Sequence, residues 1–302
     1  SIVDKVESAR YPELTTLGDV CDADALTGQI RGADVVVNLA AEHRDDVRPR
    51  SLYDRVNVDG ARSLCTAMER SGVKRLVFTS SVAVYGFAPP GTDEDGVLAP
   101  FNDYGRTKLE AERVYDDWFA RQDEATLAIV RPTVVFGPRN RGNVYNLLRQ
   151  IASGRFVMVG SGENTKSMAY VENVAGFLAF CCELDPGRYV ANYVDKPDYS
   201  MNRLVSDVRG QMGLRPSGLR LPRWVGIVGG SILDLLSHLT GRRFPVSAVR
   251  VRKFTATTAF AADRVRSLGY EPQVSLDEGL RQTVEHEFQR TPDDSDEVFY
   301  TE

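Results

Sequence analysis

The sequence is poor in the residues that build metal and disulfide sites. Its 302 residues include four cysteines and three histidines, which form no Cys-x-x-Cys pair and no metal-ligand spacing. The cysteines therefore indicate small buried side chains in a reducing compartment, and we predict no metal site. The sequence also shows no signal peptide and no uninterrupted apolar run of membrane-spanning length. We therefore predict a cytoplasmic protein.

An excess of positive charge is missing too. The formal net charge is −5, whereas nucleic-acid-binding proteins normally show a clustered basic surface, so we expect no nucleic-acid partner. The hydrophobic share of 42% and the charged share of 26% are ordinary for a globular protein. A chain of this length can bury a sizeable core, in one large domain or two closely joined ones.

The first 135 residues contain short β-rich apolar runs that alternate with amphipathic stretches. The runs lie at 2–3, 14–17, 35–39, 76–79 and 127–130, and the helical stretches lie at 22–31, 51–71 and 103–121. This alternation predicts an α/β fold, a Rossmann-type doubly wound parallel sheet with helices on both faces. Gly32, Gly72 and Gly86 stand where helices or strands end, as expected of residues that tolerate left-handed backbone.

The pattern becomes irregular after Pro138. Helices are expected at 143–153 and 172–183, followed by two or three helices and short strands after 197. We predict a sheet domain over 1–135, to which 172–195 returns, and a smaller C-terminal substrate-binding lobe made of 136–171 and 196–302.

The sequence opens with a short strand that ends in an acid, Asp4. In dinucleotide-binding folds such an acid ends the second strand, about 20 residues after a Gly-x-Gly-x-x-Gly fingerprint, and holds ribose hydroxyls. No such fingerprint stands near the start. We therefore expect a first strand and its glycine-rich loop to be missing upstream of the sequence given. The alternative is a chain that has lost its cofactor site.

Tyr104 and Lys108 stand four residues apart at the start of the expected helix 103–121. Residues at this spacing share one helical face, so the phenol and the ammonium can point into one site. A nearby cation favours the ionised form of an acid, so we expect Lys108 to lower the pKa of Tyr104 towards the working pH. Such a tyrosine can act as a general base on a hydroxyl, although the same spacing also occurs on many solvated helices.

Hydroxyl side chains end the preceding strand, in the run Thr-Ser-Ser-Val-Ala-Val-Tyr-Gly at 79–86. Open α/β sheets bind their ligands at the carboxyl ends of strands. A serine placed there can hydrogen-bond a reacting oxygen. By itself, the run would indicate only a serine-rich turn.

Together these motifs resemble the extended short-chain dehydrogenases/reductases of the NAD-dependent epimerase/dehydratase family. The resemblance is carried by Ser-Ser-x-x-Val-Tyr-Gly at 80–86, Tyr-x-x-x-Lys at 104–108, Arg-Pro-Thr-Val-Val-Phe-Gly-Pro at 131–138, Asn-Val-Asp-Gly at 57–60 and Asn-Leu-Ala-Ala at 38–41. It extends over essentially the whole chain. It implies that Tyr104 is the catalytic acid/base, that Ser81 orients the oxygen and that Lys108 holds the nicotinamide ribose.

The resemblance also implies NAD as the cofactor. A carboxylate at Asp4 would repel a 2′-phosphate, which favours NAD over NADP. Asp19 and Val20 match the family's adenine-contacting pair, although Asp19 could equally begin the helix at 22–31, and Asn57 matches an asparagine that steadies the strand ends. The implied cofactor residues are Asp4, Asp19, Val20, Leu39, Ala40, Ala41, Asn57, Ser80, Tyr104, Lys108 and Pro132.

Departures from related enzymes narrow the reaction. Dehydratases of this family carry an Asp-Glu pair after the strand-end hydroxyl, and decarboxylases carry a Glu where this sequence has Ala83. Here Val82 and Ala83 occupy those places, and apolar side chains cannot supply the acid and base of an elimination. A 4-epimerase needs only the Tyr, Ser and Lys with tightly held NAD, so we expect an epimerase.

Arginines precede the expected helix at 143–153. Guanidinium groups beside a helix N-terminus suit a diphosphate, and solvated loop charges are the alternative. The implied substrate-binding residues are Ser81, His43, Thr133, Arg139, Arg141, Asn143 and Lys166. The late Arg-x-Gly-Asp element of nucleotide-sugar epimerases is missing, and Val134 replaces a substrate-contacting asparagine. Both departures count against a UDP substrate.

The stretches 42–47, 139–148, 166–171 and 192–198 resemble one subgroup of the family. Its members are bacterial epimerases of O-antigen (lipopolysaccharide) biosynthesis that act on polyprenyl-diphosphate-linked N-acetylglucosamine. The likeness implies interconversion of N-acetylglucosamine and N-acetylgalactosamine on a diphosphate-linked amino sugar through a 4-keto intermediate. A UDP-sugar 4-epimerase, an NAD-dependent sugar or alcohol dehydrogenase and a non-catalytic NAD-sensing protein stay open as alternatives.

An apolar stretch at 221–236 precedes several basic residues between 242 and 253. This order suits contact with a lipid chain and a peripheral place at the anionic inner face of the cell membrane. An ordinary packed helix is the alternative, and exposure of Trp224 would favour membrane contact. The family resemblance further implies a homodimer formed through the helices at 51–71 and 103–121.

Overall fold

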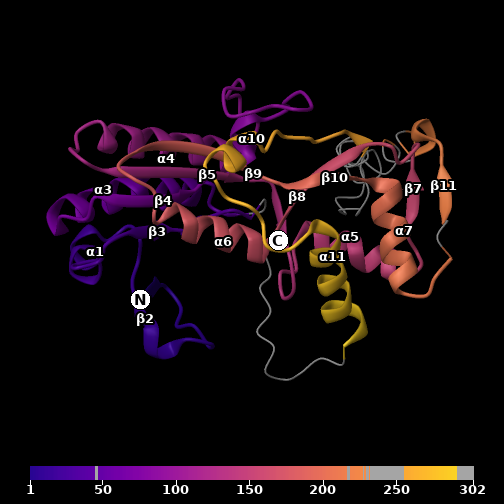
Figure 1. The fold of residues 1–302 in the computed structure, drawn as a ribbon, viewed down its shortest axis with the longest axis horizontal. Coiled ribbons are helices and arrows are strands. Elements are labelled where there is room, and N and C mark those ends of the chain that lie inside the picture. Colours follow the sequence, from indigo (N-terminus) through magenta and orange to yellow (C-terminus); the bar gives the residue numbers. More distant parts are fainter. Residues whose placement is uncertain (45–46, 216–217, 227, 229–230, 232–254, 291–302) are drawn as a thin grey trace.

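The computed structural model describes residues 1–302 except 45–46, 216–217, 227, 229–230, 232–254 and 291–302. Figure 1 shows the elements of the first half gathered at one end of the molecule and most later elements at the other end. Within the described residues, no helix is both long enough and apolar enough to cross a membrane.

Parallel strands form the main sheet. Its order is β3 (Val36–Asn38), β4 (Arg75–Thr79), β5 (Thr126–Pro132) and β9 (Gly187–Tyr193). β1 (Ile2–Asp4) and β2 (Thr15–Leu17) pair with each other in parallel, and no ladder in the described part of the chain joins them to β3. The predicted parallel sheet is confirmed, and β9 adds a late segment to it.

Helices cover both faces of this sheet. One face carries α1 (Ala23–Gln29), α3 (Gly60–Ser71) and α4 (Asp103–Phe119), and the other carries α6 (Val171–Cys181) and α10 (Asp263–Ser267). Alternate residues of a strand point to opposite faces, so Leu76 and Phe78 enter the first core and Val77 enters the second. The predicted doubly wound α/β fold is therefore confirmed.

The predicted helix at 51–71 contains an irregular turn. α2 (Ser51–Tyr53) continues through a π-helical turn at Asp54–Asp59 into α3. Such turns are frequent at functional sites, and the buried Asn57 lies inside this one.

The second half builds a further core. Its strands are β6 (Val134–Phe136), β8 (Thr165–Tyr170) and β10 (Asp195–Ser200) in one sheet and β7 (Val157–Val159) and β11 (Leu219–Leu221) in another, and its helices are α5 (Asn143–Ala152), α7 (Met201–Gln211) and α11 (Leu276–Val284). Leu148, Tyr170 and Leu280 are among its buried residues. α10, from the stretch that we assigned to this lobe, instead packs Val265 beside Phe177 of α6. The domain boundaries stay a prediction.

Candidate active site

Helix α4 begins with a cap that places Tyr104. The Asn102 side chain accepts a hydrogen bond from the Gly105 amide at 2.9 Å, which satisfies one of the free donors of the first turn. A Cβ atom on Gly105 would lie 2.5 Å from the Ala83 carbonyl oxygen. The glycine after Tyr104 therefore lets the helix start approach the turn that follows Ser81.

Ser81 and Tyr104 meet in the structure. Ser81 follows the carboxyl end of β4, and its hydroxyl hydrogen-bonds with the Tyr104 phenol. The same hydroxyl oxygen accepts the Ala83 amide at 3.1 Å, which fixes its direction. The structure thus brings together two side chains that are 23 positions apart in the sequence.

Lys108 lies one turn further along α4, on the same helical face as Tyr104. Its Nζ donates to the Thr79 carbonyl oxygen at 2.7 Å and lies 4.8 Å from the centre of the Phe78 ring. Burial lowers the pKa of Lys108 to about 7, and the negative charge of Glu112 opposes this change. Its ammonium group is therefore only partly charged at neutral pH.

The expected tuning of Tyr104 requires a correction. Burial raises the pKa of the Tyr104 phenol above its usual value, and the hydrogen bond with Ser81 is what opposes the rise. We expected Lys108 to lower this pKa, and that expectation is wrong. Desolvation of the phenol is the larger effect, and the Lys108 ammonium is directed to the backbone of Thr79.

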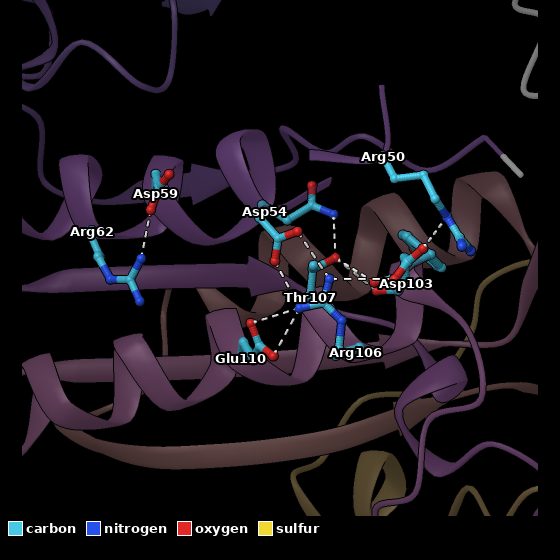
Figure 2. A network of polar contacts seen from close by, with 10 residues as sticks. Arg50, Asp54, Asp59, Arg62, Asp103, Arg106, Thr107 and Glu110 are labelled. Atoms are coloured by element: carbon cyan, nitrogen blue, oxygen red, sulfur yellow. Dashed lines mark hydrogen bonds and ion pairs between the residues drawn. The ribbon is translucent and has the colours of Figure 1, made fainter. Parts of the chain in front are cut away.

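Asn57 joins the π-helical turn to a loop and to α4. Its Oδ1 accepts the Glu42 amide at 2.8 Å, and its Nδ2 donates to the Glu42 carbonyl at 3.0 Å and to the Thr107 hydroxyl at 2.9 Å. Figure 2 shows a second link nearby, in which Arg106 of α4 contacts Asp54 at 2.8 Å. Asn57 therefore links the loop after β3 to α4, and its role beside a cofactor stays a prediction.

The other predicted cofactor residues lie around the β1 and β3 strand ends. Leu39 is 60% exposed, and Ala40 donates its amide to Asn38 at 3.0 Å. Asp4, at the end of β1, is exposed and accepts the Val6 amide at 3.0 Å. Ala41, the next residue of the β3 loop, is half-buried.

Asp19 and Val20 lie in the turn after β2. Asp19 accepts the Cys21 amide at 2.9 Å, and this hydrogen bond lowers the pKa of its carboxyl group. Asp22, three residues later, caps α1, so the alternative that Asp19 begins this helix is wrong. Val20 packs against Gly60, because a Cβ atom added to Gly60 would lie 2.8 Å from Cγ1 of Val20.

Three predicted contact residues are engaged by the protein itself. The buried Ser80 hydroxyl donates to Glu112, and the Thr133 amide donates to the Tyr193 carbonyl at 3.0 Å. Pro132 is buried at the end of β5. Their contacts with a cofactor or a substrate stay predictions.

The predicted phosphate site contains an acid that the sequence did not reveal. Glu287, 2% exposed, accepts the Arg139 amide at 2.6 Å and lies 3.5 Å from the Arg141 guanidinium. Asn143 begins α5. Glu287 comes from the turn after α11, 148 positions after Arg139 in the sequence, so no local motif could have indicated it.

Lys166 and His43 belong to other segments of the chain. Lys166 Nζ donates to the Ala256 carbonyl at 2.6 Å, and burial lowers its pKa to about 8. His43 is exposed in the loop after β3. In the described residues, no group of three His, Cys, Asp or Glu side chains could hold a metal ion.

Known proteins resemble this chain in sequence and in fold. Residues 4–191 match the NAD dependent epimerase/dehydratase family. The chain belongs to that family. It is 50% identical, over 95% of its length and 87% of the relative, to the N-acetyl-alpha-D-glucosaminyl-diphospho-ditrans,octacis-undecaprenol 4-epimerase of Escherichia coli O157:H7. The predicted family, fold class and enzyme class, an epimerase, are confirmed.

Solved structures give the same fold. MoeE5 in complex with UDP-glucose and NAD is 26% identical, with a TM-score of 0.70 over 94% of this chain and 88% of that one. The UDP-glucose 4-epimerase of Thermotoga maritima, at 21% identity, has a TM-score of 0.71 over 94% of this chain and 89% of that one. The latter likeness shows the fold alone.

The residues present fit an NAD cofactor. The exposed Leu39 and the exposed Asp4 carboxylate border the strand ends, where open α/β sheets bind dinucleotides. The Thr79 hydroxyl oxygen beside Lys108 is buried and has no hydrogen-bond partner among the described residues, which fits a site completed by a polar ligand.

Proposed function

We propose that this protein is an NAD-dependent sugar 4-epimerase that interconverts N-acetylglucosamine and N-acetylgalactosamine on a polyprenyl-diphosphate carrier. The single observation that carries the proposal is the 50% identity, over 95% of the chain, to an undecaprenol-linked N-acetylglucosamine 4-epimerase. The hydrogen-bonded Ser81 and Tyr104 pair supports it, because such a pair can hold and deprotonate a sugar hydroxyl.

NAD, when bound, supplies reversible oxidation and reduction at C4 of the sugar. Tyr104 exchanges the proton of the C4 hydroxyl: its phenolate form accepts this proton and its phenol form returns it. Ser81 donates a hydrogen bond to the same sugar oxygen and holds it in place. Lys108 would hold the cofactor ribose. A 4-keto sugar that is reduced on its other face has the opposite configuration at C4.

Features of the chain favour a polyprenyl carrier over UDP. Val134 replaces an asparagine of nucleotide-sugar epimerases, and the late Arg-x-Gly-Asp element is absent from the sequence. A UDP-sugar remains the second candidate substrate, because a structure with UDP-glucose bound is 26% identical.

Parallel incubations test the substrate. The purified protein with NAD would receive polyprenyl-diphosphate N-acetylglucosamine or UDP-N-acetylglucosamine, and the sugars would be released by mild acid and separated. We expect N-acetylgalactosamine from the lipid-linked substrate. Conversion of the UDP-sugar alone would contradict the polyprenyl assignment, and NADH accumulation without epimerised sugar would indicate a dehydrogenase.

We also propose peripheral contact with the inner face of the cell membrane. The basic residues at 242–253 and half of 221–236 lie outside the described residues. Trp224, in the described part, is 68% exposed, as expected of a side chain that inserts at a membrane interface. Binding to vesicles with anionic lipids should weaken in Trp224→Ala. Equal binding by this variant would count against contact at this residue.

A homodimer through the helical stretch 51–71, from α2 to α3, and the stretch 103–121 that contains α4 is proposed from the family resemblance. Ion pairs lie along and beside these helices, such as Arg62–Asp59 at 2.6 Å and Arg50–Asp103 at 2.7 Å (Figure 2). Light scattering on the purified protein should give the mass of two chains, and the mass of one chain at micromolar concentration would contradict the proposal.

A further inference from the structure

One face of α4 holds the strand end that carries the catalytic serine. Glu112 follows Lys108 by four residues, as Lys108 follows Tyr104, so the three side chains lie one turn apart. Lys108 Nζ donates to the Thr79 carbonyl oxygen at 2.7 Å, and Glu112 accepts a hydrogen bond from the Ser80 hydroxyl. Thr79 and Ser80 directly precede the serine, so both side chains of the helix restrain its position.

Arg131 of β5 holds the Glu112 carboxylate from the other side. Its Nε lies 2.9 Å from Oε1 and its Nη2 lies 2.6 Å from Oε2, and the two side chains are 4% and 3% exposed. Arg131 Nη1 also donates to the Tyr85 phenol at 2.7 Å, which donates to Asn192 of β9 at 2.8 Å. A buried chain of polar contacts thus runs behind the catalytic residues.

Stability is a weak reason for a buried pair of charges. Replacing such a pair by well-packed apolar residues is often neutral or stabilising, because the cost of desolvating both ions disappears. The Glu112–Arg131 pair lies directly behind the site, so a role in the reaction accounts better for its charges than a role in folding.

We propose that Glu112 is a positioning residue for the epimerase reaction: its carboxylate, clamped by Arg131, fixes the strand end that presents Ser81 and supplies the negative charge that faces Lys108. Glu112 acts through these neighbours, because its oxygens are engaged by Ser80 and Arg131. The proposal rests on the proposed epimerase function.

The charge of Glu112 opposes the effect of burial on Lys108. Burial lowers the pKa of Lys108 to about 7, and Glu112 raises it. On α4, Tyr104 and Glu112 each lie one turn from Lys108, and Arg131 of β5 lies behind Glu112. β4 contributes the Phe78 ring and a backbone carbonyl. Loss of the Glu112 charge should therefore lower the pKa of Lys108 further.

Three variants test the proposal in the full chain. Glu112→Gln removes the charge and keeps the size of the side chain. The double variant Glu112→Met/Arg131→Met removes both charges and keeps an apolar contact, so it separates the reaction from folding if the single variant is unstable. Asp116→Asn is the matched control, because Asp116 lies on the next turn of α4 and accepts Arg188 of β9 at 2.6 and 2.9 Å.

Two readouts distinguish positioning from folding. With NAD and polyprenyl-diphosphate N-acetylglucosamine, we expect kcat to fall about 10- to 100-fold in both Glu112 variants, as for a small misplacement of reacting groups, while KM and the Asp116→Asn control stay near the parent values. Without cofactor or substrate, ¹³C-lysine NMR over the chain's six lysines should show a lower pKa for Lys108 in both Glu112 variants.

A folded double variant with the parent kcat and the parent Lys108 pKa would overturn the proposal and leave the pair a structural role. An inactive parent protein with either sugar substrate would instead contradict the proposed function. The NMR titration would still report on Glu112 in that case, so the two failures are distinguishable.

Discussion

Ser81 and Tyr104 share a hydrogen bond at the carboxyl end of β4, and a different element holds each of them in place. Ser81 takes its position from the strand end, and Tyr104 takes its position from the Asn102 cap of α4. Because both are held by backbone contacts, the pair is formed before any sugar binds. A preformed pair of this kind lowers the cost of orienting the reacting hydroxyl.

Tyr104→Phe removes the acid/base and keeps the ring. General acid–base catalysis contributes about 10²- to 10⁴-fold, so we expect kcat for epimerisation to fall by that order with NAD binding nearly unchanged. Tyr189→Phe, which removes an exposed phenol bonded to the Asp185 carbonyl, should behave as the parent. Full activity of Tyr104→Phe in the sugar-release assay would exclude the assigned role.

The Lys108 amine should make stability depend on pH. The unfolded chain keeps its proton up to the usual pKa of 10.5, whereas burial lowers the folded pKa to about 7. Between these two pKa values the unfolded state binds more protons than the folded state, so the free energy of unfolding rises with pH. This gain in stability disappears as the pH falls towards 7. Urea unfolding of the NAD-free protein from about pH 7 to about pH 9 should show this rise.

Lys108→Met should flatten that dependence, because methionine does not titrate. The control is Lys74→Met, since Lys74 is exposed and donates to the Asp123 carbonyl at 3.0 Å. An unchanged slope in Lys108→Met would mean that Lys108 has an ordinary pKa in the folded protein.

Sequence spacing predicted the candidate catalytic residues, whereas it did not reveal the side chains that hold them in place. Tyr104 and Lys108 could be predicted together because residues four positions apart lie on the same face of a helix. Glu287 and the Glu112–Arg131 pair were not, because each contact joins elements that are distant in the sequence or requires a known register between strand and helix. The predicted direction of the Tyr104 pKa shift was wrong for the same reason, since burial is a property of the packed structure.

At the scale of elements, Asn57 connects three segments from within the π-helical turn. Asn57→Ala would leave the Glu42 backbone groups and the Thr107 hydroxyl without this partner. We expect a loss of about 1–3 kcal/mol in the free energy of unfolding, the cost of buried polar groups left unsatisfied, and weaker NAD binding. Asn146→Ala, which removes a surface contact with Arg149, should cost less than about 0.5 kcal/mol in the same denaturant titration.

Two helical glycines should respond in opposite ways to alanine. A Cβ on Gly279 of α11 would lie 2.6 Å from the Tyr170 ring, whereas one on Gly210 of α7 would meet nothing within 4 Å. Gly279→Ala should destabilise the protein by about 1–3 kcal/mol through overpacking, and Gly210→Ala should stabilise it by about 0.5–1 kcal/mol through lower backbone entropy. Thermal unfolding of both variants checks the contrast, and a stabilised Gly279→Ala would show that α11 can move away from β8.

The predicted elements of the first half match the structure closely, and those of the second half do so less. Runs such as 76–79 and 127–130 are buried on both sides, so they are continuously apolar and visible in the sequence. β8 and β10 contain Lys166, Asp195 and Lys196, and their pairing depends on partners from other parts of the chain. No local pattern therefore indicated these strands.

At the scale of the whole molecule, the two halves carry different parts of the candidate site. The sheet domain supplies Ser81, Tyr104 and Lys108, and the second core supplies the arginine cluster at the N-terminus of α5. β9 returns the chain to the sheet before β10 enters the second core. A substrate with its reacting sugar at the first site and its diphosphate near the second would span both parts, which agrees with a diphosphate-linked sugar.

The fate of a deuterium label at C4 of the sugar tests the central claim most directly. The protein with NAD would receive polyprenyl-diphosphate N-acetylglucosamine that carries deuterium at C4, and the released sugars would be separated and analysed by mass spectrometry. Epimerisation by oxidation and reduction at C4 predicts N-acetylgalactosamine that retains the label. Product that has lost the label to water, or no epimerised product at all, would contradict the account.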